Sequence, residues 1–348
     1  MTTVRPMRVL VTGGIGMLGA AAIRALLHRG HDAISVDIRP RSVDMPVIPH
    51  YEVDIADAAG VEGVFAAERI DAVIHTASLV DLHLGQPARL RQVNVDGTRN
   101  LLHACRRHNA ARFVYVSSAE AIAGTEPLVA VTEAEAAYPY PHLTYYGVTK
   151  QAAEELVLVA NSDDLATCAL RTFGLFGPGD RTVVPRFLHT LPTRTVRLIG
   201  DGLRRGPLAT TDVVYADNYA HALVLAVEQL EPAKAWAGTP LHVTDGIPVN
   251  IQRFLADLVQ PLGYDLDERR YVPRWLVERV ADVFAARYRT VPLERFARPP
   301  VSRHMIRLAL DDYYLDATRI RRELGYEPPV DRATAVKATQ AWLQDGRH

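Results

Sequence analysis

The chain passes from a strand pattern to a helix pattern through Thr12-Gly13-Gly14-Ile15-Gly16-Met17-Leu18-Gly19. Residues 8–12 form a short β-branched run that is typical of a buried strand. A helix pattern follows, in which the apolar residues Leu18, Ala21, Ala22, Ala25 and Leu26 recur at helical spacing, and Gly30 is suited to end the helix. Glycines between a strand and a helix allow a tight turn and leave backbone amides open to a pyrophosphate. The stretch therefore predicts the first unit of a dinucleotide-binding α/β fold.

Later strand ends extend this predicted cofactor site. The strand of residues 32–36 runs into Asp37, eighteen residues after Gly19, where an acid can bind a ribose 2′-hydroxyl. Asp37 would repel a 2′-phosphate, which favours NAD over NADP, although Arg39 and Arg41 offer positive charge nearby. The residues predicted to bind the cofactor are Gly13, Gly14, Ile15, Gly16, Met17, Leu18, Gly19, Asp37, Ile38, Arg39, Asp54, Ile55, Thr76, Ala77, Ser78, Val116, Ser117, Tyr146, Lys150, Phe173 and Gly174.

Composition narrows the possible partners. A chain of 348 residues is typically long enough to form about two lobes. The 39 basic and 40 acidic side chains nearly cancel, which argues against nucleic acid as a partner. Cys105 and Cys168 lie in apolar segments and form no metal or disulfide pattern, so we expect buried thiols in a reducing, cytoplasmic compartment. Glycines interrupt the apolar stretch 9–27, which is therefore neither a signal peptide nor a membrane span.

Tyr146 and Lys150 stand four residues apart in a segment with helical character, so their side chains share one face. An ammonium beside a phenol lowers the phenol pKa from its usual value of about 10. A phenol tuned in this way can give or take a proton at neutral pH. The same spacing also occurs by chance between packing residues, so the other motifs must decide between the two interpretations.

Three more polar residues stand at predicted strand ends or on apolar helices. Ser118 follows the strand 112–116 at the carboxyl edge of the sheet, where it can bind a substrate oxygen or simply end the strand. Asn94 is a polar exception in the helix pattern of residues 92–108 and is placed to hold a neighbouring strand or a water. His75 is more typical of a structural histidine than of a proton carrier. None of these residues belongs to a metal-binding pattern, and no metal is expected.

In combination, these motifs resemble the extended short-chain dehydrogenase/reductase superfamily over most of the chain. The resemblance rests on the glycine stretch, Asp37, the run Asn94-Val95-Asp96-Gly97-Thr98, Ser118, Tyr146 and Lys150. It implies that Tyr146 is the acid/base and that Lys150 binds the nicotinamide ribose and lowers the Tyr146 pKa. Ser118 is then expected on the substrate oxygen, with Asn94 in support. Relatives of this kind often dimerise through helices that correspond to residues 92–108 and 146–160, so we expect a homodimer.

The expected fold class is α/β, a doubly wound parallel Rossmann sheet with a smaller, discontinuous C-terminal substrate lobe. The dinucleotide-binding domain is expected to comprise residues 1–172 and 212–244, and the substrate lobe residues 173–211 and 245–348. Residues 115–120, 242–249 and 313–328 look like the 3β-hydroxysteroid dehydrogenase and sterol-decarboxylating branch, which includes lipid-ketone reductases. This implies NAD-dependent interconversion of a secondary alcohol and a ketone on a steroid-, lipid- or polyketide-like small molecule.

The enzymatic alternative is a nucleotide-sugar epimerase, dehydratase or reductase that uses the same Tyr/Lys pair. Such enzymes typically carry an arginine where Thr211 precedes Asp212, although Arg204 or Arg205 could replace it. Dehydratases also carry an Asp-Glu pair where this chain has Ala119-Glu120, and Glu120 is most simply a solvated or ion-paired carboxylate. A third alternative is a module that senses its nucleotide without catalysis, against which the complete Ser/Tyr/Lys set speaks.

Residues 273–284 form an amphipathic pattern with Trp275, Leu276, Val280, Val283 and Phe284 toward one side. An ordinary lobe helix that packs on its own core is one interpretation. A helix that covers an apolar substrate is another, and peripheral contact with a membrane is a third that we do not favour. The segment carries too many charges to span a bilayer.

Overall fold

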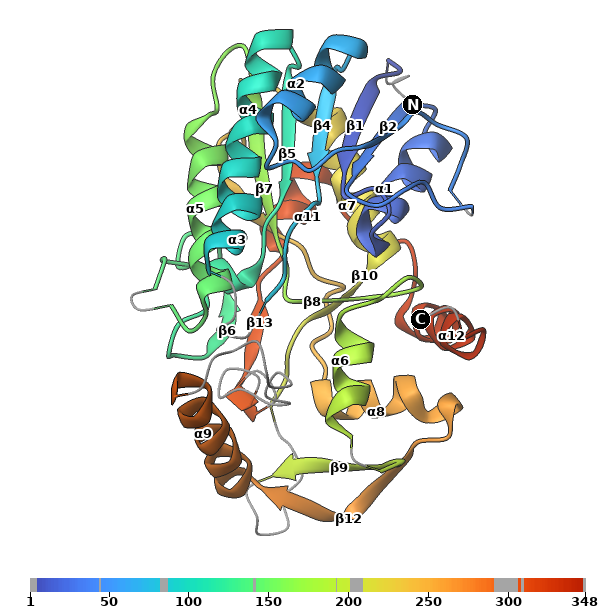
Figure 1. Cartoon of the computed structure of the whole chain (residues 1–348), viewed down its shortest axis with the longest axis vertical. Helices are drawn as coiled ribbons and strands as arrows, with labels where there is room; N and C mark the ends of the chain where they lie inside the picture. Colours follow the sequence, from blue (N-terminus) through green and yellow to red (C-terminus); the bar gives the residue numbers. More distant parts are fainter. Residues whose placement is uncertain are drawn as a thin grey trace.

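The computed structural model describes residues 5–43, 45–81, 87–139, 142–191, 193–200, 209–290, 306–307 and 310–346. A central sheet of seven parallel strands has the order β11-β7-β5-β4-β1-β2-β3 (Figure 1). Its strands are β1 (Arg8–Thr12), β2 (Asp32–Asp37), β3 (His50–Glu52), β4 (Ala72–His75), β5 (Arg112–Val116), β7 (Ala166–Arg171) and β11 (Pro240–His242). The strand order reverses between β1 and β4, which creates a crevice at their carboxyl ends.

Helices cover both faces of this sheet, as the near-continuous apolar strands require. One face carries α1 (Met17–His28), α7 (Ala216–Gln229) and α11 (Thr318–Leu324), whose side chains share a core with β1. The other carries α2 (Ala58–Ala67), α4 (Gly97–His108) and α5 (Tyr145–Val159), which share a second core with Phe113 and Tyr115. The doubly wound Rossmann fold predicted from the sequence is confirmed. Cys105 and Cys168 are buried as expected.

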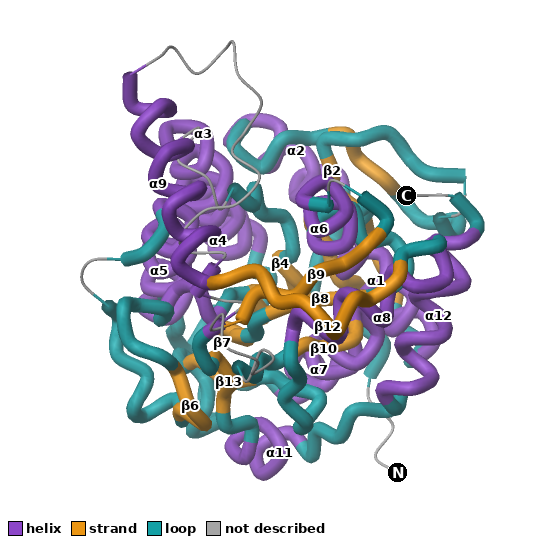
Figure 2. Tube along the Cα trace, turned by 90° about the horizontal axis from the view of Figure 1, so that it is seen from below, coloured by secondary structure: helices purple, strands orange, loops and turns teal. Residues whose placement is uncertain are grey.

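A smaller lobe lies beyond the carboxyl edge of the sheet (Figures 1 and 2). Three two-stranded sheets bridge to it or lie within it: β8 (Gly174–Phe176) with β10 (Val213–Tyr215), β9 (Thr195–Gly200) with β12 (Asp265–Pro273), and β6 (Leu128–Val131) with β13 (Tyr313–Leu315). Its helices are α6 (Val183–Thr190), α8 (Ile251–Val259), η3 (Gln260–Leu262), α9 (Arg274–Thr290) and α12 (Arg332–Gln344). Short helices α3 (Pro87–Arg91), η1 (Gln92–Asp96) and η2 (Ala119–Ala121) border the crevice.

Some elements differ from the sequence expectation. The helix expected at residues 92–108 begins as a π-helical turn, η1, before α4. The division into 1–172 with 212–244 and 173–211 with 245–348 stays a prediction, and Ile320, Leu324 and Tyr326 pack into the core around α1 and α7. Arg204 and Arg205 lie outside the described residues.

The amphipathic segment predicted at residues 273–284 falls on α9, and its apolar side chains are largely exposed. Trp275 is 63% exposed and Val283 67%. Val277, on the same helix, lines the large cleft described below. The side chain of Phe284 lies outside the described residues. None of the helices in the described residues is both long and apolar enough to cross a bilayer.

Candidate active site

A cleft of about 1160 Å³ lies between the carboxyl edge of the sheet and the smaller lobe. We call its wall from the central sheet, with Tyr146 and Lys150, the sheet half, and its wall from residue 172 onward the lobe half. Most of the predicted site residues line it: Gly13, Gly16, Met17, Leu18, Gly19, Asp37, Ile38, Arg39, Asp54, Ile55, Thr76, Ala77, Ser78, Val116, Ser117, Ser118, Tyr146, Lys150, Phe173 and Gly174. Gly14, Ile15 and Asn94 are not among the residues that line it.

The glycine turn brings backbone close to backbone. A Cβ atom at Gly19 would lie 2.1 Å from the Gly13 carbonyl oxygen, and one at Gly14 would lie 2.1 Å from Ser35 Oγ. Gly13 has a φ of +69°, which L side chains rarely adopt. Gly16 is the N-cap of α1 and no side chain caps that helix in the described structure. The amides of its first turn therefore have no acceptor within the helix and can bind an anion.

Asp37 lies at the end of β2 beside this turn and is 6% exposed. Its Oδ2 accepts a hydrogen bond from the Ile15 amide at 3.0 Å, so Ile15 shapes the site from behind the cleft surface. Arg39 Nε lies 3.1 Å from Asp37 Oδ1, whereas the Arg41 guanidinium turns away to the Pro46 carbonyl at 3.1 Å. The two arginines that follow Asp37 in sequence are therefore separated in space, and only Arg39 lines the cleft.

Asp54 lines the sheet half of the cleft after β3. Its Oδ1 accepts a hydrogen bond from the Ala56 amide at 2.9 Å, and its Oδ2 pairs with Arg89 Nη2 at 2.5 Å. This ion pair and the backbone hydrogen bond outweigh the effect of burial and lower the pKa of Asp54. Arg89 was missed by the sequence analysis, because nothing in the pattern around α3 distinguishes it from a surface arginine.

His75 is a buried structural residue, as the sequence favoured. Its Nδ1 lies 2.7 Å from Thr12 Oγ1 and its Nε2 lies 3.0 Å from Thr98 Oγ1. Thr98 Oγ1 donates to the Asn94 carbonyl at 2.6 Å, so it accepts from Nε2 and leaves Nδ1 as the acceptor. Burial lowers the pKa of His75 to about 3, which keeps the ring neutral. The chain of hydrogen bonds ties β1 to η1.

Asn94 fixes two walls of the site from behind. Its Oδ1 accepts from the Leu79 amide at 2.8 Å, and its Nδ2 donates to Thr149 Oγ1 at 3.0 Å. Thr149 Oγ1 in turn donates to the Tyr146 carbonyl at 2.8 Å. Asn94 therefore connects the segment after β4 with the first turn of α5, and holds neighbouring backbone as the sequence suggested.

The first turn of α5 positions Tyr146. Thr144 caps the helix, because its Oγ1 accepts from the Gly147 amide at 2.9 Å. A Cβ at Gly147 would lie 2.7 Å from the Glu120 carbonyl oxygen, so glycine permits α5 to pack directly on η2. Tyr146 is 7% exposed and lines the cleft. Glu120 is 7% exposed and lines the cleft as well, so of the two alternatives that the sequence suggested, solvated or ion-paired, the solvated one is wrong.

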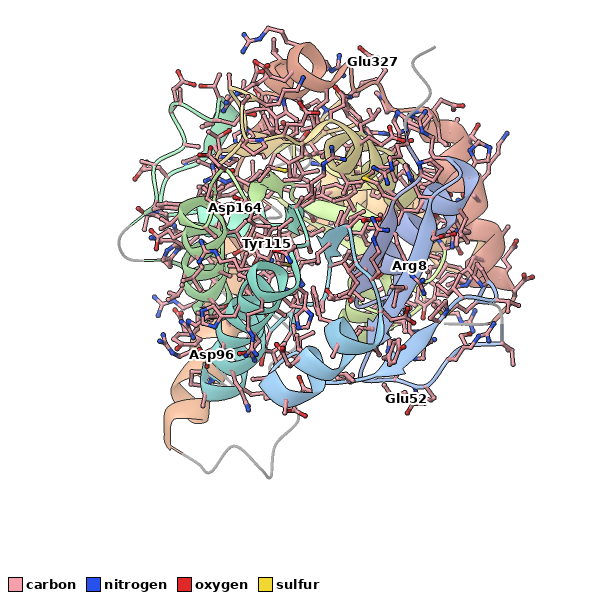
Figure 3. The ribbon with its side chains drawn as sticks, turned by 90° about the horizontal axis from the view of Figure 1, so that it is seen from above. Arg8, Glu52, Asp96, Tyr115, Asp164 and Glu327 are labelled. Carbon is pink, nitrogen blue, oxygen red and sulfur yellow. The ribbon has the colours of Figure 1, made fainter. Side chains whose placement is uncertain are left out.

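Lys150 lies one turn further along α5 and is 2% exposed. Its Nζ donates to the Val116 carbonyl at 2.7 Å and sits 4.2 Å from the centroid of the Tyr115 ring. Figure 3 shows Tyr115 in the interior of the fold. Burial lowers the pKa of Lys150 to about 7, and the negative charge of Glu154 opposes this effect. At neutral pH the charged and the neutral form of Lys150 are therefore both populated.

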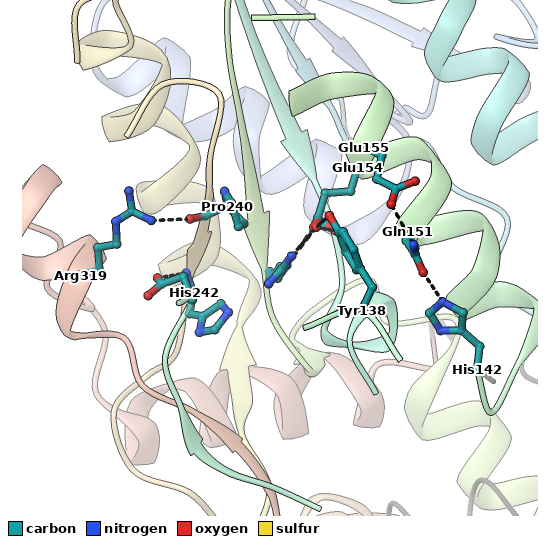
Figure 4. Close-up of polar contacts among 11 residues, drawn as sticks. Tyr138, His142, Gln151, Glu154, Glu155, Pro240, His242 and Arg319 are labelled. Carbon is teal, nitrogen blue, oxygen red and sulfur yellow. Dashed lines mark hydrogen bonds and ion pairs between the residues drawn. The ribbon is translucent and has the colours of Figure 1, made fainter. Parts of the chain in front are cut away.

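Glu154, a further turn along α5, accepts hydrogen bonds from three segments, and Figure 4 shows it beside one of the donors, Tyr138. Tyr138 OH donates to it at 2.7 Å, Ser117 Oγ donates to the other oxygen, and Arg171 Nε donates at 3.0 Å. Arg171 and the other hydrogen-bond donors lower the pKa of Glu154 despite its burial. The stripe from Tyr146 through Lys150 extends by the same four-residue step to Glu154, so the sequence held a signal for Glu154 that we missed. Arg171 carried no such signal.

Ser118 is the N-cap of η2 and lines the cleft at 8% exposure. Its Oγ accepts a hydrogen bond from the Glu120 amide at 3.1 Å. The hydroxyl proton of Ser118 can therefore be donated to a ligand while the amide fixes the oxygen.

The lobe half of the cleft is mainly apolar. Its apolar lining residues are Phe173, Leu175, Val183, Phe187, Leu191, Val196, Leu198, Ile199, Ile251, Leu255, Val272, Val277 and Ile306. Thr211 lines it too, and its Oγ1 donates to the Tyr313 carbonyl at 2.8 Å. The described residues contain no group of three or more His, Cys, Asp and Glu side chains that could hold a metal ion.

Sequence comparisons assign the chain to a family. A 3-beta hydroxysteroid dehydrogenase/isomerase family model matches residues 10–274. A 2-alkyl-3-oxoalkanoate reductase of Stenotrophomonas maltophilia is 31% identical over 341 residues, which cover 96% of this chain and 99% of that protein. A 3 beta-hydroxysteroid dehydrogenase/Delta 5→4-isomerase of Mycobacterium tuberculosis is 34% identical over 345 residues, which cover 92% of this chain and 86% of that protein.

Solved structures share the fold at lower identity. A UDP-glucose 4-epimerase of Thermotoga maritima, solved with UDP-glucose, is similar with a TM-score of 0.72 and 23% identity, covering 98% of this chain and 100% of that chain. A UDP-glucose 4-epimerase of Thermus thermophilus, solved with NAD, has a TM-score of 0.69 at 23% identity, covering 97% and 99%. The chain thus belongs to the 3-beta hydroxysteroid dehydrogenase/isomerase family of the extended short-chain dehydrogenase/reductase superfamily and is an enzyme of this type.

Proposed function

We propose that the protein interconverts a secondary alcohol and a ketone on a hydrophobic small molecule, with NAD as the hydride acceptor or donor. The observation that carries this proposal is the continuity of one cleft. The glycine turn, the Ser118, Tyr146 and Lys150 side chains and the apolar lobe half all border it. A nucleotide on the sheet half and an apolar substrate on the lobe half would therefore meet beside Tyr146.

The sheet half fits a dinucleotide. The turn at Gly13, Gly16 and Gly19 forms a cradle in which an added Cβ would meet backbone within 3.0 Å at each position. The free amides at the start of α1 suit a pyrophosphate, and Asp37 suits a ribose 2′-hydroxyl. We therefore assign NAD rather than NADP, with Asp54, Ile55 and residues 76–78 along the adenosine side and Phe173 and Gly174 toward the reacting end.

The side chains around Tyr146 supply proton transfer and orientation. Bound NAD supplies the chemistry of accepting a hydride from the carbinol carbon, or of returning one to the ketone. In the oxidation, the Tyr146 oxygen takes the hydroxyl proton of the alcohol, and in the reduction it gives a proton to the ketone oxygen. A protonated Lys150 stabilises the phenolate form of Tyr146, and the Ser118 hydroxyl donates to the same substrate oxygen.

The apolar lobe half favours a lipid, steroid or polyketide-like substrate over a nucleotide sugar. Two relatives are named for a 2-alkyl-3-oxoalkanoate, which is a keto acid with an alkyl branch, and for a 3 beta-hydroxysteroid. Thr211 stands where nucleotide-sugar epimerases and dehydratases typically carry an arginine, and its hydroxyl donates to the Tyr313 carbonyl. A thermal shift with UDP-glucose in the presence of NAD tests the alternative, because a raised Tm would favour the epimerase class.

Substitution of Tyr146 by Phe tests the proposed chemistry. Loss of the phenol oxygen should lower kcat by about 10²-fold or more, because no proton donor or acceptor remains at that atom. NAD affinity, measured by calorimetry, should stay within about threefold of the wild type. Tyr145→Phe is the matched control, since Tyr145 is the neighbouring phenol on α5 and does not line the cleft. Unchanged turnover of hydrophobic ketones in Tyr146→Phe would refute the assignment of Tyr146 as the proton donor and acceptor.

We also propose that the protein is a homodimer that pairs through α4 and α5. On α5, Val148 and Val159 are 40% and 84% exposed, which is consistent with a partner helix on that side. Light scattering tests this, and a mass equal to one chain would refute it.

A further inference from the structure

β9 forms a wall of the lobe half and presents two different faces. Val196 and Leu198 are 2% and 1% exposed and pack into the core of the lobe with Phe254. Alternate residues of a strand share a face, so Thr195 and Arg197 project from the opposite one. Both line the cleft, as does Thr193, which continues the same alternation before the strand begins. Val196 and Leu198 line it too, so the cleft borders β9 on both of its faces. Two hydroxyls and a guanidinium therefore follow one another along this wall.

The positive charge of Arg197 is available to a ligand. Its side chain is 55% exposed, and its Nε lies 3.9 Å from Asp267 Oδ2 on β12, at the outer limit of an ion pair. Asp180 and Asp212 also line the lobe half but are 1% and 2% exposed. The Asp180 carboxylate accepts from the Thr182, Val183 and Val184 amides, and Asp212 Oδ2 accepts from the Leu315 amide at 2.7 Å. These acids are turned to backbone amides, whereas Arg197 and Arg181 meet the cleft with their side chains accessible.

Building on the proposed function, we propose that the substrate carries an anionic oxygen group at the end remote from its reacting carbon, and that Arg197 and Thr195 bind this group. A guanidinium offers a planar pair of donors that matches a carboxylate or a phosphate, and a threonine hydroxyl adds a third donor. β9 lies at the end of the lobe remote from the central sheet (Figure 1), whereas Tyr146 is on α5, which packs on that sheet. Apolar side chains including Leu255 and Val272 line the cleft as well. The substrate class is thus an acidic lipid rather than a neutral sterol.

A pair of matched ligands tests the anionic subsite by binding rather than by turnover. The ligands are a long-chain fatty acid with a secondary hydroxyl in mid-chain and its primary amide, both below their critical micelle concentrations. Calorimetry with the NAD-saturated protein should give the acid an affinity about tenfold higher than the amide, a value moderated by solvent exposure of Arg197. The preference should fall as salt is raised.

Arg197→Gln should remove the preference for the acid and change amide affinity less than twofold, while Arg197→Lys should keep part of it. Arg253→Gln is the control for a lost charge, because Arg253 is exposed on α8 in the same lobe and does not line the cleft. A coenzyme A thioester of the same chain distinguishes the two sources of the anion. If the thioester binds more tightly than the acid, and Arg197→Gln abolishes this difference in affinity, the anionic group is a phosphate. If the acid binds more tightly than the thioester, the group is a carboxylate.

Equal binding of acid and amide by the wild type, or binding of neither, would overturn the inference, as would the same losses in Arg197→Gln and Arg253→Gln. The proposed function fails separately. An acid that binds through Arg197 but is not turned over would refute the redox chemistry alone. Turnover of acid and amide with equal kcat/KM would refute the anionic subsite alone.

Discussion

In the sheet half of the cleft, backbone forms much of the surface, whereas side chains form the lobe half. Gly13, Gly16 and Gly19 bring main chain to within contact of main chain, and Asp37 and Asp54 are each held by backbone amides. In the lobe half the lining comes from β8, β9, α6, α8, β12 and α9, which are far apart in sequence. A wall of backbone leaves little freedom for substitution, so it suits one invariant ligand. A wall of side chains can be changed residue by residue, so it suits a ligand that varies among relatives.

The largest effect is expected from a methyl group added to the sheet half. Gly19→Ala places a Cβ 2.1 Å from the Gly13 carbonyl oxygen. That oxygen is a backbone atom and cannot rotate away as a side chain would, so the turn itself must shift. We expect NAD affinity to fall by about 10²-fold, since a displaced turn misaligns the amides of α1. Calorimetric titration with NAD measures this change.

The control for that substitution is Gly63→Ala on α2. A Cβ at Gly63 meets no atom within 4 Å, and alanine is the better helix former. This variant should bind NAD as the wild type does and be slightly more stable. If both variants bind NAD as the wild type does, the close approach of the main chain at Gly19 to the main chain at Gly13 is not required for NAD binding.

At the boundary between the halves, Lys150 should make stability depend on pH. Its pKa is about 7 in the folded protein and 10.5 in the reference state, so between these values the unfolded chain binds more protons. Stability relative to Lys150→Met should therefore rise with pH over this window, by up to about 1.4 kcal/mol per pH unit. Below pH 7, Lys150 is protonated in both the folded and the unfolded wild type. The difference in unfolding free energy between the wild type and Lys150→Met should therefore level off there.

Urea unfolding of the wild type and Lys150→Met at a series of pH values measures this difference. Subtraction of the two curves removes the contributions of the titrating groups that do not interact with Lys150. A flat difference across the window would mean that Lys150 keeps its charge despite its burial.

A smaller effect is expected from a single side chain of the lobe half. Phe187→Ala removes a ring that lines the cleft and packs on the lobe core. Loss of its apolar contact with substrate should raise KM for hydrophobic substrates about fivefold to tenfold, while NAD affinity and kcat change little. Steady-state kinetics with a hydrophobic ketone would show the separation, and a matching loss of NAD affinity would contradict the independence of the two halves.

Much of the sheet half could be predicted because its determinants are local. The glycine spacing before α1, the acid at the end of β2 and the four-residue step from Tyr146 to Lys150 each depend on neighbours within one turn or one strand end. Gly14, Ile15 and Asn94 are instructive exceptions, since they support the wall from behind rather than line it. A motif identifies which residues belong together, but the packing of the main chain decides which of them meet the cleft.

The sequence by itself determined the Rossmann topology, the glycine cradle and the shared face of Tyr146 and Lys150, because periodicity and spacing act over a few residues. Only the tertiary structure decided the rest. It joined Glu154 to Arg171, Ser117 and Tyr138 from separate segments, turned Arg41 away while Arg39 stayed on Asp37, and set Arg197 on the wall of the lobe half. The physical reason is that burial and pairing of charges depend on which elements pack together, and distant elements leave no local pattern in the chain.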